Sequence, residues 1–404
     1  MRSIGIRSAG EGMASSQSSS QSSSRARQTR SLRRFVQALG LALFFLLLFG
    51  FFPALSSILP ADLYLQLDPL TGLSSALASR SWVHALTFGL VLLSLTLLFG
   101  RYFCGWICPL GALLDGFGAT TDLWRALRSR MARRLAASLP AREASPAEKV
   151  AVAGTDSCTE DEASAPLPVL RGRDWKLLLL LLLLAAAPFG LQLAYLLDPL
   201  PLLARAFALL GIPQVARPVA LPPPGIVPAG WTAVLLLAAI VLLSLIARRF
   251  WCRHLCPLGG LLALASRFSL FKLLSRSCTS CGSCPSSCPM GIRELGTVRQ
   301  DSECIRCYSC AVACSRHEVG LGLHSGAVGS PLDLGRRAAV GSLAAGALLG
   351  ASGRLVLART PAERILPLRP PWAGEEPRFL GQCIRCGTCI RACPTGTLRA
   401  LFFE

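Results

Sequence analysis

All but Cys158 of the 17 cysteines in this 404-residue chain fall into five tight groups. Three groups share one spacing, with two, two and three residues between successive cysteines. Three thiolates on such a turn can bind three irons of a cubane, so the pattern indicates bacterial-type 4Fe–4S clusters. Zinc sites use isolated Cys-x2-Cys pairs, and disulfide frameworks spread cysteines through small secreted domains, so neither fits. The groups are Cys278, Cys281, Cys284 and Cys288; Cys304, Cys307, Cys310 and Cys314; and Cys383, Cys386, Cys389 and Cys393.

The first two groups are close enough in the sequence to form one two-cluster module. In such modules the fourth cysteine of each run binds the cluster of the other run. We therefore predict two ligand sets, which are Cys278, Cys281, Cys284 and Cys314 for cluster 1, and Cys304, Cys307, Cys310 and Cys288 for cluster 2.

The third group predicts a third cluster but has no companion run. Cys393 closes a lone cluster locally, or a partner chain supplies the missing half, or the sequence is part of a longer protein. We favour the second and third alternatives over the first.

The other two groups are pairs with three intervening residues, each followed by Pro-Leu-Gly. Cys104 and Cys108 lie in CGWICPLG, and Cys252 and Cys256 lie in CRHLCPLG. This spacing places both thiols of a pair on one face of a helical turn. We expect the four thiols to converge on a shared redox-metal or dithiol site. The alternative is that the Cys-Pro turns only shape the helix ends.

Long apolar runs must position these cysteines, in a chain that is 52% hydrophobic. Four runs hold about 17–25 residues each, enough to cross a hydrocarbon core of about 30 Å. Arginines are abundant before the first run, after the second and after the fourth, and sparse elsewhere. The positive-inside rule then places the N-terminus and both Cys-Pro pairs on the cytoplasmic side. The predicted spans are approximately 35–59, 82–100, 175–197 and 231–247.

The spans form an internal repeat. LDPL at 67–70 recurs at 197–200, and RYFCGWICPLGALL from Arg101 matches RFWCRHLCPLGGLL from Arg249. Each unit contains two spans, which predicts a parallel repeat about a pseudo-two-fold axis along the membrane normal. Asp68 and Asp198 precede prolines and are expected to end helices just outside the membrane. The predicted fold class is a membrane all-α protein with four transmembrane helices, a fifth weak span, and an α+β dicluster ferredoxin module.

Seven segments follow from these features. Arg336 and Arg337 precede a mildly apolar stretch, as in a Tat export signal; the alternative is an ordinary anchor helix. Either interpretation places 358–404 outside the cytoplasm. The segments are 1–34, a disordered basic N-terminus; 35–124, the first membrane repeat; 125–172, a variable cytoplasmic loop; 173–268, the second repeat; 269–325, the two-cluster ferredoxin domain; 333–357, the twin-arginine-like segment; and 358–404, the third cluster motif.

Residues 35–315 resemble the membrane polyferredoxins of the NapH, NosR and CcoG group. The doubled two-span unit, the paired CPLG motifs and the following dicluster module carry the likeness. Residues 333–404 resemble the start of a NapG-like exported ferredoxin fused behind. The resemblance implies electron transfer between a quinone pool and a respiratory or assembly partner. The chain departs from the NosR pattern in having no sizeable N-terminal domain for a flavin, and from the NapG pattern in ending after one motif.

The sequence thus predicts an integral electron carrier of the bacterial inner membrane, partnered by quinone or quinol, a respiratory reductase and lipid. His84, near the outer end of the second span, is a candidate for taking a quinol proton. His254 could add a metal ligand, although Trp106 is its counterpart in the first repeat. Covalent haem is not expected, because Cys-x2-Cys-His is absent. Nucleic acid is not expected either: the net charge is +19, but the basic residues flank hydrophobic helices.

Two rival functions remain at this stage. The protein could be a metal-reducing assembly factor or a redox-regulatory factor for a copper or respiratory enzyme. It could also be an enzyme that passes electrons between cytoplasmic ferredoxin and quinone. Neither the electron donor nor the direction of flow follows from the sequence.

Overall fold

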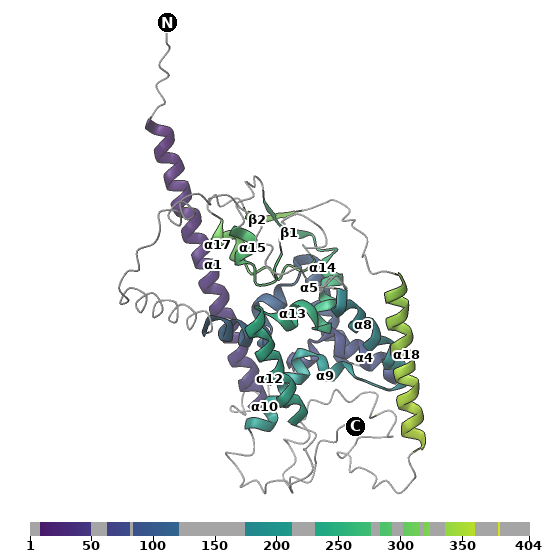
Figure 1. The fold of residues 1–404 in the computed structure, drawn as a ribbon. Helices are drawn as coiled ribbons and strands as arrows, with labels where there is room; N and C mark the ends of the chain where they lie inside the picture. The colour runs from purple at the N-terminus through teal and green to yellow at the C-terminus, as the bar shows by residue number, and fades with distance from the viewer. Residues whose placement is uncertain are drawn as a thin grey trace, which may run out of the picture.

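The computed structural model describes residues 9–49, 63–80, 84–120, 174–211, 231–275, 283–292, 302–314, 319–323, 336–359 and 379. The described chain is mostly helical, with one two-stranded sheet (Figure 1). The third cluster motif, Cys158, Cys278 and Cys281 lie outside the described residues, as does the predicted loop 125–172.

The longest element is helix α1, Ala9–Phe49, which extends well beyond the bundle (Figure 1). The expected disordered N-terminus is therefore helical from Ala9 onward. The segment is rich in Ser, Gln and Arg and contains no proline that would interrupt a helix continuing from the apolar end. Among the described helices, α1 holds the single stretch that is long and apolar enough to cross a membrane, Gln28–Leu48.

The internal repeat is visible in the order of the elements. The first unit has α3 (Leu63–Gln66), α4 (Pro69–Ser79), α5 (His84–Phe99), the π-helical turn η1 (Phe103–Ile107) and a helix over 109–120. The second has α9 (Ala194–Leu197), α10 (Pro199–Gly211), α12 (Trp231–Ile246), α13 (Phe250–His254) and α14 (Pro257–Ser266). Asp68 follows the end of α3, as expected, and it also begins the next helix, because it caps α4 by accepting from the amides of Leu70 and Thr71.

Two of the predicted spans match single helices, because α5 and α12 cover most of 82–100 and 231–247. The predicted third span is broken: α8, Asp174–Ala186, ends in the short 3₁₀ turn η2, Ala187–Phe189. Pro188 cannot continue the hydrogen-bond ladder, and Gly190 takes a left-handed conformation, φ +85°. An apolar run alone does not show where such a break falls.

The surface of this bundle is apolar on α5 and α12. Side chains such as Phe88, Val91, Leu235, Leu242 and Ile246 are exposed, while the inner faces of the same helices reach the buried core. α5 and α12 are nonetheless only 16 residues long, about 24 Å at 1.5 Å per residue.

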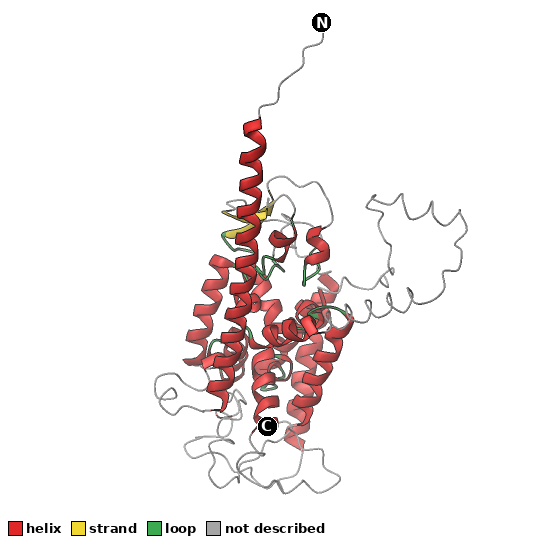
Figure 2. Ribbon diagram, turned by 90° about the vertical axis from the view of Figure 1, so that its left-hand side faces the viewer, coloured by secondary structure: helices red, strands yellow, loops and turns green. Residues whose placement is uncertain are grey.

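The ferredoxin module caps one end of the bundle. β1, Phe271–Ser275, pairs antiparallel with β2, Val319–Leu323, and the short helices α15, Ser283–Ser287, and α17, Ser309–Ala313, pack together beside them. The ring of Phe99 at the end of α5 stacks on Phe271, with centroids 5.5 Å apart. Figure 2 shows the strands at the end of the bundle from which the N-terminal part of α1 emerges.

The last described helix, α18, Arg336–Arg359, begins with the twin arginines and packs along α8 (Figure 1). Gly346 and Gly350 form the contact: a Cβ on Gly346 would lie 2.3 Å from the carbonyl oxygen of Leu182, and one on Gly350 would lie 2.8 Å from Phe189. This is the small-x3-small packing common between membrane helices. Residue numbers rise together along the contact, so α18 runs parallel to α8 and away from the ferredoxin module.

Candidate electron-transfer site

The described ferredoxin cysteines of the two runs lie near one another. Cys288, from the first run, lies within electrostatic range of Cys304, Cys307 and Cys310, and these three lie within range of one another. For cluster 1, Cys284 approaches the carbonyl of Cys310, at 3.9 Å, and its partners Cys278 and Cys281 lie outside the described residues.

The sulfur atoms of this set are sheltered and receive backbone hydrogen bonds. The amide of Ile292 donates to Cys288 Sγ at 3.4 Å. Burial raises the pKa of Cys304 to about 12, so a bound metal must supply the positive charge that makes it a thiolate. Amide donors and burial are the means by which a protein tunes a cluster's potential.

The four thiols of the Cys-Pro pairs also converge. Cys104, Cys108, Cys252 and Cys256 pack in one hydrophobic core. Cys252 lies within electrostatic range of the other three thiols, and Cys104 lies within range of Cys256. We call these four residues the core thiols.

Neither group of cysteines is arranged for a single ion. Within the described part of the chain, no three Cys, His, Asp or Glu side chains are close enough together to hold one metal ion. This applies to the ferredoxin set and to the core thiols alike. In a cubane each thiolate binds a different iron, so its ligands are more widely spaced than those of one zinc or iron ion.

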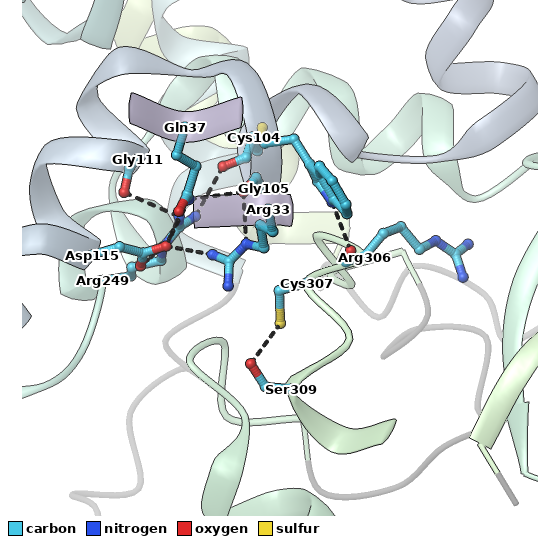
Figure 3. Close-up of polar contacts among 11 residues, drawn as sticks. Arg33, Gln37, Cys104, Gly105, Gly111, Asp115, Arg249, Arg306, Cys307 and Ser309 are labelled. Carbon is cyan, nitrogen blue, oxygen red and sulfur yellow. Dashed lines mark hydrogen bonds and ion pairs between the residues drawn. The ribbon is translucent and has the colours of Figure 1, made fainter. Parts of the chain in front are cut away.

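The core thiols lie directly beneath the ferredoxin module. Cys104 packs against the small cluster formed by Met290, Ile292, Ile305 and Cys307, which Cys288 and Cys304 also contact. Close approach is possible because the next residue is Gly105, where a Cβ would lie 2.1 Å from the carbonyl oxygen of Ile305. The indole nitrogen of Trp106 donates to the carbonyl oxygen of Arg306 at 2.9 Å (Figure 3).

One buried arginine joins the two repeats. Arg249, from the second repeat, donates to both carboxylate oxygens of Asp115, at 2.7 and 2.8 Å, and to the carbonyl of Cys104 at 2.9 Å. Arg33 and Gln37 of α1 bind the same carboxylate (Figure 3). Burial alone would raise the pKa of Asp115, but the two guanidinium groups outweigh it and lower the pKa to about 2.

Arg101 is the counterpart in the first repeat. Its Nη1 atom donates to Glu303 of the ferredoxin module at 2.9 Å, and Lys176 at the start of α8 binds the same oxygen. All three side chains are nearly inaccessible to solvent. Two ion-pair groups result, each with two cations and one carboxylate: Arg33, Arg249 and Asp115 in one, and Arg101, Lys176 and Glu303 in the other. Arg101 and Arg249 also act electrostatically on the core thiols.

The sequence-based analysis missed these ion-pair groups. Arg101 and Arg249 were counted only as topology signals, although both precede a Cys-Pro pair by three residues. That repeated Arg-x2-Cys is the signal by which they could have been found.

Asp68 and Asp198 form a buried pair. Both side chains are fully buried, and their carboxyl groups face each other across the two repeats. A Cβ on Gly89, within α5, would lie 2.8 Å from the Cα of Pro69, so the LDPL segments lie inside the bundle beside α5. The expectation that they lie just outside the membrane stays a prediction, because Gly89 is only five residues from the start of α5.

The two histidine candidates lie at helix ends. His84 is the first residue of α5, at the end away from the ferredoxin module. His254 is the last residue of α13 and packs on Phe250, with ring centroids 4.8 Å apart.

Comparison with known proteins places this geometry in a family. A family model described as a 4Fe-4S binding domain matches 81–131 and 229–276, the two segments that carry the Cys-Pro pairs. A second model with the same description matches 380–399, around the third cysteine run. The ferredoxin-type protein NapH of Haemophilus influenzae is 26% identical over 61% of this chain and 72% of its own length.

The chain is therefore similar to NapH-like polyferredoxins, and the family models support binding of 4Fe–4S clusters. The methylamine utilization ferredoxin-type protein MauN of Methylorubrum extorquens is 27% identical to this polyferredoxin over 65% of the chain and 76% of MauN. The putative electron transport protein YccM of Escherichia coli is 39% identical over 20% of the chain and 24% of YccM.

The matches at 39% identity or above span only 22% to 38% of the relatives' own length. No solved structure matches the polyferredoxin significantly. The comparisons and the helical architecture together support iron–sulfur electron transfer as the general activity.

Proposed function

We propose that this polyferredoxin relays electrons between the quinone pool and a respiratory oxidoreductase partner in the bacterial inner membrane. The observation that carries the proposal is the contact of Cys104 with the cluster that surrounds Cys288, Cys304 and Cys307. It supports a role for the core thiols as a shared redox site, a cluster or a dithiol, that adjoins cluster 2. Electrons then pass between the membrane core and cluster 2 first, and between cluster 2 and cluster 1 second.

The four-span architecture is part of the same proposal. Exposed apolar side chains over α5 and α12 suit a lipid environment, since a soluble surface rarely carries such a large apolar patch. α5 ends at the module, where Phe99 stacks on Phe271. The segment after α12 leads to Arg249, which binds the carbonyl oxygen of Cys104 beneath the module. α8 begins there, with Lys176 on Glu303. With the arginine-rich segments at the same end, the ferredoxin module and the N-terminus are assigned to the cytoplasm.

The proposal extends to the two ends of the relay. α18 leads away from the module, which supports an extracytoplasmic place for 358–404 and its third cluster. Packing through Gly346 and Gly350 favours an anchor helix over a cleaved export signal. His84 stays a candidate quinone contact at the outer end of α5, about 22 Å along the helix from Phe99.

The test is anaerobic purification in detergent, followed by mixing with a reduced quinone analogue while the clusters are followed by EPR and visible absorption. Rapid cluster reduction, or reoxidation by the oxidised analogue, supports the relay. Clusters that respond to dithionite but to neither form of the quinone would exclude the quinone step and favour a metal-reducing assembly role. Iron counting fixes the number of clusters: about eight irons per chain for two and about twelve for three.

A further inference from the structure

We propose that Asp68 and Asp198 form a proton-binding site that takes up one proton when the redox centre beside it is reduced. The inference rests on the proposed electron relay. It concerns a pair of residues to which the relay itself assigns no role.

The geometry of the pair requires a proton. Both side chains are 0% exposed. Among the described residues, Asp68 Oδ2 is buried and receives no hydrogen bond from a backbone amide, and the Asp198 carboxyl group is approached only by the amide of Leu200 and by Asp68. The two carboxyl groups face each other closely enough to share a hydrogen bond, and two carboxylates can do so only when one of them carries a proton.

Capping accounts for only part of this arrangement. Oδ1 of Asp68 accepts from the amide of Leu70 at 2.9 Å, which is an ordinary helix cap. Asp198 likewise accepts from the amide of Leu200 at the start of α10, so both carboxyl groups are caps. Capping does not require the two carboxyl groups to face each other, however, and Ser or Asn would cap equally well without the cost of burying a charge. The pair therefore adds something that helix termination does not require.

The neighbours of the aspartate pair connect it to the core thiols. Asp198 lies within electrostatic range of Cys104, and Cys256 lies within range of Asp198. On α9, which leads into Asp198, the hydroxyl of Tyr195 is already bonded to Ser75 of α4 at 2.7 Å. The ionisable groups that act on the pair are thus the core thiols.

Charge balance gives the direction of coupling. With one shared proton the pair carries a charge of −1. When hydroquinone gives one electron to the redox centre at the core thiols, that centre gains a negative charge. This second negative charge raises the proton affinity of the nearby aspartate pair. Binding of one proton then makes the pair neutral and cancels the added charge. The position of the pair, beside the middle of α5, places it between the outer end of that helix and the core thiols.

The test is a mediator titration of every redox centre in the full-length, cluster-loaded protein between about pH 5.5 and 8.5. At least one centre should have a midpoint potential that falls as the pH rises, by up to about 59 mV per pH unit, the value for one proton per electron. Asp198→Asn and the double change Asp68→Asn with Asp198→Asn should flatten that slope. Ser75→Ala, which breaks the neighbouring Tyr195 bond and leaves both carboxyls, should retain it.

A second measurement keeps the test decisive if a variant loses its clusters. Reduced-minus-oxidised infrared spectra of the unaltered protein should show the carbonyl stretch of a carboxylic acid gaining intensity on reduction. The proposal is overturned if no centre depends on pH, if the asparagine variants keep the slope, or if the potential follows Na⁺ concentration in place of pH. Dye mediators replace quinol throughout, so failure of the quinone step leaves this result interpretable.

Discussion

Arg249 donates a hydrogen bond from Nη2 to the carbonyl oxygen of Gly111, 3.1 Å away in the opposite repeat. The reciprocal relation holds on the other side, where a Cβ on Gly259 would lie 3.0 Å from Nη2 of Arg101. Arg249 of the second repeat therefore lies over Gly111 of the first, and Arg101 of the first repeat lies over Gly259 of the second. The two motifs interlock about the pseudo-two-fold axis, and the core thiols lie where they cross.

A side chain at Gly111 should disrupt this interlock. In Gly111→Ala the new Cβ would lie 2.9 Å from the carbonyl oxygen of Cys104 and 3.2 Å from Arg249. The backbone cannot yield easily, so we expect a loss of about 1–3 kcal/mol, measured as a lower thermal midpoint in detergent. Gly116→Ala in the same helix is the matched control, because nothing lies within 4 Å of that position. Equal losses in both variants would show that the interlock contributes nothing.

Acid should weaken the ion pair between Asp115 and Arg249 by protonating the Asp115 carboxylate. The folded pKa of Asp115, about 2, lies below the value of about 3.9 for an unfolded aspartate. The resulting stabilisation, about 2–3 kcal/mol, is complete above pH 4 and is lost as the pH falls toward 2. Asp115→Asn should remove it at every pH and leave Arg249 without its anionic partner, at a cost of about 3–5 kcal/mol. Unfolding midpoints at pH 7, 4 and 2.5 check both statements; an unchanged acid profile in Asp115→Asn contradicts them.

Features set by residues close together in the chain could be predicted from the sequence, whereas contacts between distant residues could not. The spacing of the runs predicts cubane ligands, because ligand geometry within a run is set over a few residues, and the crossed assignment of Cys288 stays a prediction. The two-fold repeat likewise followed from the matching LDPL and CPLG segments. The role of Arg101 did not follow, since an arginine at a membrane boundary has an ordinary topological explanation. Its partner Glu303 is 202 residues away, and only the folded chain brings them together.

The broken third span and the glycine contacts illustrate the same limit. Pro188 could end or merely kink a helix, and hydropathy gives the same score for both outcomes. Gly346 and Gly350 lie in a segment so rich in glycine that their spacing alone does not predict a packing contact. The structure distinguishes them from Gly341, because they alone of the three touch α8 and η2.

That distinction yields a prediction for α18. Gly346→Leu should separate α18 from α8, because even a Cβ would clash with the carbonyl oxygen of Leu182. Gly341→Leu, on the same helix with nothing within 4 Å, should leave the packing intact. Limited proteolysis of the detergent-solubilised protein should cleave before α18 several-fold faster in the first variant than in the second. Identical cleavage rates would mean that α18 is held by something other than this contact.

Replacing Cys288 tests the ligand assignment and the order of the relay together. Cys288 precedes the second run, yet it lies with Cys304, Cys307 and Cys310. Cys288→Ser should therefore remove cluster 2, lowering the iron content by about four per chain, and spare cluster 1. The magnetic coupling between the two reduced clusters should vanish from the EPR spectrum. Cys158→Ser, outside every motif, should change none of these properties.

In Cys288→Ser, the rate at which cluster 1 is reduced then tests whether electrons pass through cluster 2. Cluster 2 adjoins Cys104, so without it cluster 1 should still be reduced by dithionite but at least tenfold more slowly by a quinol analogue. If Cys288→Ser instead removes cluster 1, each run binds its own cluster and the crossed assignment is wrong. If cluster 1 is reduced by quinol at the normal rate, electrons do not enter through the core thiols and cluster 2.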